Sequence, residues 1–141
     1  MSETLVDSNV ILDVLTEDPR WLEWSSAQLE READHSILVI NPLIYAEVSI
    51  RFERIEDLDD ALPSTMVRRD PLPWEPGFLA GKCFVSYRER GGVRRAPLPD
   101  FYIGAHAAVA GMTLLTRDAS RYRSYFPDLP VIAPGSRYDA P

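Results

Sequence analysis

The sequence has 141 residues, of which 45% are hydrophobic and 26% are charged, and its formal net charge at pH 7 is −7. This length and composition fit a single globular domain over residues 1–141 and argue against a disordered or repetitive chain. The single cysteine, Cys83, excludes an internal disulfide bond and is typical of proteins from a reducing compartment.

The chain shows no sign of a leader or a membrane span. Its first residues, MSETLVDSNVILDVL, lack a basic stretch and turn acidic at Asp7. The longest run without a formal charge at pH 7 is Phe101–Thr116, which is shorter than the roughly 20 apolar residues that a spanning helix needs. We therefore expect a cytoplasmic protein without a membrane partner.

Short apolar runs and helical patterns alternate along the chain. In chain order, they predict a strand over Thr4–Val6, a helix over Val10–Leu15, a helix from Pro19, a strand over Ser36–Ile40, a helix over Leu43–Arg54, a short helix and loop over 56–65, a strand within Met66–Leu72, a helix over Gly77–Arg90, a helix over Phe101–Ala110, a strand over Thr113–Thr116 and a strand over Val131–Ala133. Asn41 and Pro42 supply the helix cap and first-turn proline before Leu43. Such alternation is typical of an α/β protein with a parallel sheet that is covered on both faces.

Four carboxylates stand out by their positions. Asp7 and Asp118 each follow a predicted strand, and in parallel neighbours the two would face one crevice beyond the carboxyl ends. Asp100 starts a helix, and the loop before it is long enough to bring it to the same place. Asp100 could also be an ordinary helix cap, Asp118 a turn residue, and Asp7 a cap for the helix near Asn9.

Glu47 is the most informative of the four, because it lies on or beside an apolar helical stripe. An ionised carboxylate there would cost several kcal/mol unless it were paired or bound to a metal. Two explanations remain open: an ion pair with Arg51, four residues on, or a cation shared with the other carboxylates. In contrast, Asp13 reads as a surface residue and His106 as a packed core or interface residue.

Several carboxylates in one cleft repel one another unless a divalent cation compensates them. Ligands that are all oxygen favour Mg²⁺ or Mn²⁺, and such hydrated ions activate water and stabilise charge on phosphate. The pattern therefore indicates a phosphodiesterase site. The basic residues agree with a nucleic-acid substrate in their distribution: residues 1–81 carry 6 basic and 17 acidic side chains, whereas residues 82–123 carry 8 basic and 3 acidic ones. A merely solvated basic surface explains this distribution equally well.

At these residues the chain resembles the PIN-domain nucleases, specifically VapC-like toxins. The resemblance is carried by four motifs, which are DSNVILDVL, NPLIYAEV, PDFYIGAHAAVAG and TLLTRDASRY. It covers nearly the whole chain, and the order and spacing of the motifs make it more specific than any one of them.

The resemblance implies a three-layer α/β/α sandwich with a parallel sheet of about five strands. It implies that Asp7, Glu47, Asp100 and Asp118 hold Mg²⁺ or Mn²⁺, with Asn9 and Thr116 steadying the site. The reaction would be hydrolysis of RNA by a homodimer that a small antitoxin protein silences. We expect Arg94, Arg95 and Arg117 to contact RNA phosphates. Trp21 and Trp24 fit either an antitoxin groove or the core.

Other functional interpretations of the sequence are weaker, but an experiment must distinguish them from the nuclease. A haloacid-dehalogenase-like phosphatase needs a second Asp where this chain has Asn9, and both it and a receiver domain need a well-placed lysine, whereas the only lysine is Lys82. A PIN-fold module that binds RNA or protein without cutting is the main alternative from another class. A PIN nuclease of RNA maturation, rather than a toxin, is the third.

Overall fold

A computed structural model describes residues 2–93 and 98–135 of the chain. It contains helices and strands in the order β1 (Ser2–Val6), α1 (Ser8–Leu15), α2 (Leu22–His35), β2 (Ser36–Ile40), α3 (Pro42–Ser49), α4 (Ile55–Ala61), β3 (Arg68–Arg69), α5 (Glu75–Glu89), α6 (Leu98–Ala110), β4 (Thr113–Leu115), α7 (Ser120–Tyr125) and β5 (Val131–Ile132). The described helices include none that is long and apolar enough to cross a membrane.

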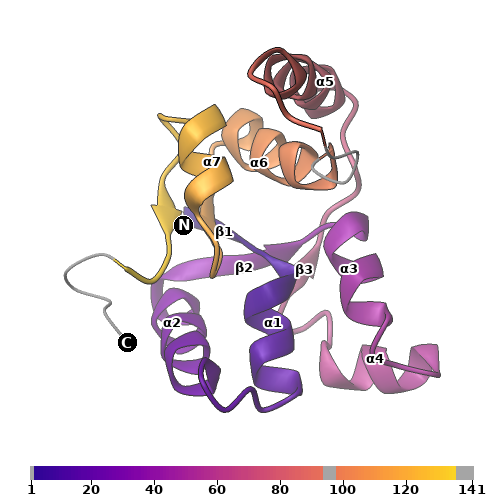
Figure 1. Ribbon diagram of the computed structural model, residues 1–141. Helices are drawn as coiled ribbons and strands as arrows, with labels where there is room; N and C mark the ends of the chain where they lie inside the picture. The colour runs from indigo at the N-terminus through magenta and orange to yellow at the C-terminus, as the bar shows by residue number, and fades with distance from the viewer. Residues whose placement is uncertain (1, 94–97, 136–141) are drawn as a thin grey trace.

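The strands form one parallel five-stranded sheet, as expected, and their order is β3-β2-β1-β4-β5. Helices α1 and α2 cover one face of this sheet and α6 and α7 the other, while α5 packs on the outside of α6 (Figure 1). The three layers are therefore those of an α/β/α sandwich. Each central strand is buried on both faces, which explains its continuous apolar run.

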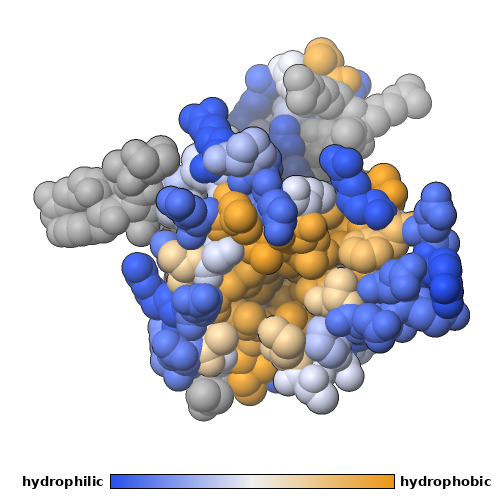
Figure 2. All heavy atoms as spheres, turned by 90° about the horizontal axis from the view of Figure 1, so that it is seen from below, coloured by the Kyte–Doolittle hydropathy of each residue, from blue (hydrophilic) through white to orange (hydrophobic). Residues whose placement is uncertain are grey.

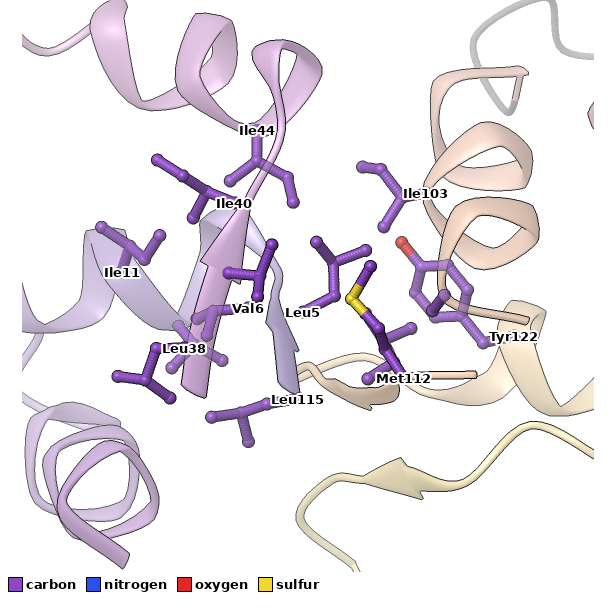
Figure 3. Close-up of a cluster of buried hydrophobic side chains, with 14 of the residues drawn as sticks. Leu5, Val6, Ile11, Leu38, Ile40, Ile44, Ile103, Met112, Leu115 and Tyr122 are labelled. Atoms are coloured by element: carbon purple, nitrogen blue, oxygen red, sulfur yellow. The ribbon is translucent and has the colours of Figure 1, made fainter. Parts of the chain in front are cut away.

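The core lies on both sides of the sheet. Successive residues of β1 point to opposite faces, so Val6 meets the α1–α2 layer, with Ile11 and Leu38 nearby (Figure 3). On the other side, Phe101 and Ile103 of α6 are fully buried. His106 of α6 is also buried, and its Nδ1 lies 3.1 Å from Asn41 Nδ2, which confirms the prediction of a packed histidine.

Two boundaries differ from the sequence-based prediction in ways that affect the site. The helix predicted over Leu43–Arg54 ends at Ser49, and a separate helix, α4, begins at Ile55. The segment after Asp118, where the sequence pattern predicts no helix, contains the helix α7. The buried Tyr122 and Phe126 lie four residues apart there, and this spacing is the signal from which α7 could have been predicted.

Candidate metal-binding and active site

The ends of two neighbouring strands place Asp7 beside Thr116. Strands β1 and β4 pair in parallel with Val6 opposite Leu115, and the Asp7 N–H donates to the Leu115 carbonyl over 2.9 Å. The Thr116 hydroxyl donates to Oδ2 of Asp7 over 2.9 Å, and the Ser8 N–H donates to Oδ1 over 2.8 Å. Asp7 is only 5% exposed, so these donors hold its carboxylate in one orientation.

Asn9 joins this arrangement from α1. Its Nδ2 donates to the Thr116 hydroxyl over 3.3 Å, and its Oδ1 accepts from the Arg117 N–H over 3.0 Å. The Asp118 N–H also donates to the Thr116 hydroxyl, over 3.2 Å. The segment that carries Asp118 is thus tied to the strand that carries Asp7.

Glu47 reaches the same edge from α3. The Asn41 side chain caps this helix by accepting from the Ile44 N–H over 3.0 Å, and Pro42 follows in the first turn, as predicted. Glu47 accepts a hydrogen bond from the Ser8 hydroxyl over 3.2 Å and forms no ion pair with Arg51. The structure therefore removes the simpler of the two explanations for Glu47.

Asp100 and Asp118 belong to the C-terminal part of the chain: Asp100 lies in α6, and Asp118 lies between β4 and α7. Asp100 lies in the first turn of α6, which begins at Leu98, so it is not the cap of that helix. Asp118 precedes α7 and accepts from the Ser120 hydroxyl over 3.2 Å. All four carboxylates line one open pocket of about 460 Å³, together with Ser8, Asn9, Tyr87, Ser120, Arg121, Tyr122, Ser124 and Tyr125.

The carboxylates of this pocket disfavour one another's ionisation. Burial raises the pKa of Asp7, the hydrogen bond from Thr116 opposes that shift, and the charge of Asp100 adds to it. Burial also raises the pKa of Glu47, and the charges of Asp7 and Asp100 raise it further. The pKa of Asp100 is raised by burial, against the opposing effect of Arg121. The pocket is therefore short of positive charge.

Oxygen ligands with excess negative charge fit a hard divalent cation such as Mg²⁺ or Mn²⁺. Within residues 2–93 and 98–135, no three Asp, Glu, His or Cys side chains lie close enough to ligate one ion directly. Mg²⁺ usually keeps several of its waters, and the pocket is large enough for a hydrated ion. The residues present thus suit an ion that is held partly through water.

Helix α7 supplies five pocket residues that the sequence analysis missed, and two of them, Tyr122 and Arg121, contact Asp7 and Asp100. The Tyr122 hydroxyl donates to Asp7 Oδ2 over 3.1 Å, and its ring packs in the core, in the cluster that includes Met112 and Ile103 (Figure 3). Burial raises the pKa of Tyr122 well above its usual value, and the charge of Asp7 adds to this, so the hydroxyl stays protonated. Arg121 Nη1 lies 2.8 Å from Asp100 Oδ2.

The structure corrects the expectation for Asp13 and shows where Arg117 lies. Asp13, read as a surface residue, is only 2% exposed and accepts from the Ser25 hydroxyl of α2 over 2.7 Å. Arg117, expected to contact RNA, does not line the pocket; its Nε lies 3.0 Å from Asp13 Oδ2, and its guanidinium lies over the Trp21 ring. Arg94 and Arg95 lie outside the residues that the structure describes.

The fold and the matched motifs define a family. The family model for the PIN domain matches residues 4–126, and the chain belongs to this family. No sequence among the curated proteins matches the chain.

Solved structures support the same fold. A chain of VapBC2 from Rickettsia felis, solved bound to a DNA fragment from its promoter, superposes with a TM-score of 0.72 at 16% identity, over 92% of this chain and 97% of that one. A chain of VapBC-1 from nontypeable Haemophilus influenzae gives 0.70 at 18% identity, over 92% and 96%. A chain of FitAcB from Neisseria gonorrhoeae gives 0.67 at 18% identity, over 92% and 96%.

Proposed function

We propose that this protein is a Mg²⁺- or Mn²⁺-dependent endoribonuclease and the toxin of a toxin–antitoxin pair. The observation that supports the nuclease most directly is the pocket in which Asp7, Glu47, Asp100 and Asp118 meet. Four carboxylates from distant parts of the chain share it with Arg121, the one arginine in its lining among the described residues. Such a group of carboxylates suits a divalent cation, and a bound divalent cation suits the hydrolysis of a phosphodiester.

In this proposal Asp7, Glu47, Asp100 and Asp118 would hold the ion partly through its own waters, and the bound ion would supply an activated water and neutralise charge on phosphate. Asn9 and Thr116 keep Asp7 and Asp118 in place through the hydrogen bonds described above. The openness of the site to solvent on one side suits a polymeric substrate whose backbone crosses the pocket.

The cleavage assay that tests the proposal uses defined tRNA and rRNA, with Mg²⁺, with Mn²⁺ and with chelator. We expect cleavage that needs the ion, and we expect Glu47→Gln to reduce it at least 100-fold while the protein stays folded. Activity that survives EDTA would contradict the proposed chemistry. A folded protein that binds RNA but never cuts it would favour the non-cleaving module instead.

An apolar groove supports the assignment as a toxin with a protein partner. It measures about 240 Å³ and lies between α1, α2, α4 and β2; its lining is Val6, Ile11, Val14, Leu15, Leu29, Glu30, Ala33, Leu38, Ala61, Leu62, Met66 and Val67. Figure 2 shows apolar side chains gathered on this face, with hydrophilic ones around them. Neither Trp21 nor Trp24 lines the groove.

We assign this groove to an amphipathic segment of the antitoxin. Nearby α4 carries the acidic side chains Glu56, Asp57, Asp59 and Asp60, so the segment should place basic residues beside its apolar face. The similar folds come from toxin–antitoxin complexes, which agrees with a partner of this kind. A nuclease of RNA maturation would have no such neighbour-encoded partner.

We further propose that the protein is a homodimer. Helix α5 packs on α6 and leaves Trp74, Phe78 and Val85 exposed, at a spacing that places them along one side of the helix. A large apolar stripe of this kind is typical of a protein interface. In a two-fold arrangement of antiparallel α5 helices, Glu75 of one copy would lie near Arg88 of the other.

A further inference from the structure

Within residues 2–93 and 98–135, one basic side chain lines the pocket, and it is not one of the three arginines expected to contact RNA. Among the residues that the structure describes, Arg121 is the only Arg or Lys that lines the carboxylate pocket. Arg117 is held away from it by Asp13 and Trp21. In the part of the chain that the structure describes, the positive charge of the site therefore comes from the first turn of α7.

Arg121 is held in place by contacts of two kinds. Its Nη1 forms an ion pair with Asp100 Oδ2 at 2.8 Å, and its guanidinium carbon lies 5.9 Å from the ring centres of Tyr87 and Phe101. The side chain is nevertheless 30% exposed, so it can turn toward solvent without unfolding α7. An arginine also carries five N–H donors in a planar fork, more than Asp100 can accept.

Arg121 and a divalent cation would compete for the same carboxylate, because Arg121 already occupies Oδ2 of Asp100 and its positive charge repels a cation bound beside it. A cation that binds the pocket takes over the negative charge of Asp100 and thereby weakens the ion pair with Arg121. The freed guanidinium then lies at the rim of the same pocket, where its fork matches the geometry of a phosphate group.

We propose that Arg121 competes with the divalent cation for Asp100 and, once released, binds a phosphate of the nucleic acid. This inference rests on the proposed nuclease function and names the residue that contacts its substrate. In the protein without a bound cation, the charge of Arg121 neutralises the carboxylate of Asp100. In the protein with cation and nucleic acid bound, the same side chain neutralises a phosphate of the substrate backbone.

The test compares three variants with the wild type. Arg121→Gln removes the charge, Arg121→Lys keeps the charge but loses the fork, and Arg123→Gln is the matched control, because Arg123 is exposed on the same helix and does not line the pocket. For each, Mn²⁺ affinity is measured by electron paramagnetic resonance. Affinity for a single-stranded RNA oligonucleotide is measured by fluorescence anisotropy in Ca²⁺ at several salt concentrations, and the oligonucleotide is checked on a gel for integrity.

We expect Arg121→Gln to bind Mn²⁺ about threefold to tenfold more tightly, because a repelling charge is gone. We expect it to bind RNA about tenfold more weakly, with the slope of log affinity against log salt reduced by about 0.7. Arg121→Lys should keep the wild-type Mn²⁺ affinity and bind RNA with an intermediate affinity, and Arg123→Gln should match the wild type in both measurements.

Unchanged or weaker Mn²⁺ binding by Arg121→Gln would overturn the competition, and an unchanged RNA affinity and salt slope would overturn the phosphate contact. These failures differ from a failure of the proposed function. A wild-type protein that binds neither Mn²⁺ nor RNA overturns the function and the inference together. A wild type that binds both, with Arg121→Gln behaving like Arg123→Gln, overturns the inference alone.

Discussion

The hydroxyl of Tyr122 donates to Oδ2 of Asp7 over 3.1 Å, although 115 positions separate the two residues in the sequence. The same oxygen accepts from Thr116, so two buried hydroxyls fix one carboxylate at the floor of the pocket. Partners of this kind orient the groups that ligate a metal and tune its affinity.

The change Tyr122→Phe removes this hydroxyl and keeps the ring. We expect the Mn²⁺ affinity to fall about tenfold, since Asp7 loses one of its fixed donors. We expect the free energy of unfolding, measured in urea, to fall by about 1–2 kcal/mol, because a buried carboxylate loses a hydrogen bond. Tyr125→Phe is the control, because Tyr125 also lines the pocket but forms none of the hydrogen bonds to Asp7. Equal Mn²⁺ affinities in the two variants would show that the Tyr122 hydroxyl does not position Asp7.

The metal-free protein should lose stability as the pH rises through the weakly acidic range because of Glu47. Its pKa in the folded protein lies above the ordinary value, mainly through burial and then through the charge of Asp7. A carboxyl group with a raised folded pKa favours folding at low pH, and this contribution disappears as the pH passes from the unfolded pKa to the folded one.

In EDTA, Glu47→Gln should therefore be more stable than the wild type at pH 7, by a few tenths to about 1 kcal/mol, because the site is partly exposed. At pH 4 the difference should vanish. Mg²⁺ should raise the melting temperature of the wild type more than that of the variant. Melting curves at both pH values, with and without Mg²⁺, measure this directly. A variant that is less stable than the wild type at pH 7 in EDTA would contradict the proposed repulsion.

The buried Asp13 should contribute strongly to stability. It accepts from the Ser25 hydroxyl and forms an ion pair with Arg117 whose geometry falls short of a hydrogen bond. Asp13→Ala leaves the Ser25 hydroxyl without its acceptor and the Arg117 guanidinium without its counter-charge, so we expect the free energy of unfolding in urea to fall by about 2–4 kcal/mol. Asp34→Ala, at an exposed position of α2, should change the free energy by less than about 0.5 kcal/mol. Comparable small effects in both variants would mean that the Asp13 contacts contribute little.

The apolar groove should bind the antitoxin independently of the nuclease site. Ala33 is exposed on α2 and lines the groove, so Ala33→Asp places a charge on the apolar surface without disturbing the core. We expect at least 100-fold weaker binding of the small protein encoded next to this gene, and unchanged RNA cleavage.

Ala27→Asp is the control for that experiment, because Ala27 is exposed on the same helix outside the groove. Isothermal titration gives the affinities. If Ala33→Asp binds the partner as tightly as Ala27→Asp does, the partner occupies another surface.

The proposed dimer gives a further prediction. Phe78→Asp charges the exposed side of α5, so light scattering should show a monomer for this variant and a dimer for the wild type. The fold should be unchanged, because Phe78 is mostly exposed. A monomeric wild type would refute the dimer.

The central part of the fold could be predicted from the sequence, because it depends on local patterns. The apolar runs Ser36–Ile40 and Thr113–Leu115 each form a strand, and the Asn41 cap predicts the start of α3. The sequence also predicts that Asp7 and Asp118 share one crevice if their strands are parallel neighbours, and the structure shows that β1 and β4 are. The strands and the start of α3 need no knowledge of distant contacts, whereas the pairing of β1 with β4 does.

The remaining features depend on partners that lie far apart in the sequence. Asp13 resembles a surface residue because its partners, Ser25 and Arg117, belong to other elements. Helix α7 mixes charged residues with Tyr122 in a short segment, so its helical pattern is weak. For this reason Arg121 was missed, although it is the arginine that lies in the pocket.

The outer strands of the sheet restrict how the protein can assemble. Strands β3 and β5 have two residues each, and Pro71 and Pro134 follow shortly after them. Such short edges leave few free N–H and C=O groups, and proline cannot donate to a further ladder. A partner protein that added a strand of its own to this sheet would therefore form few hydrogen bonds with it. Complexes of this protein should instead be built by packing side chains against its helices.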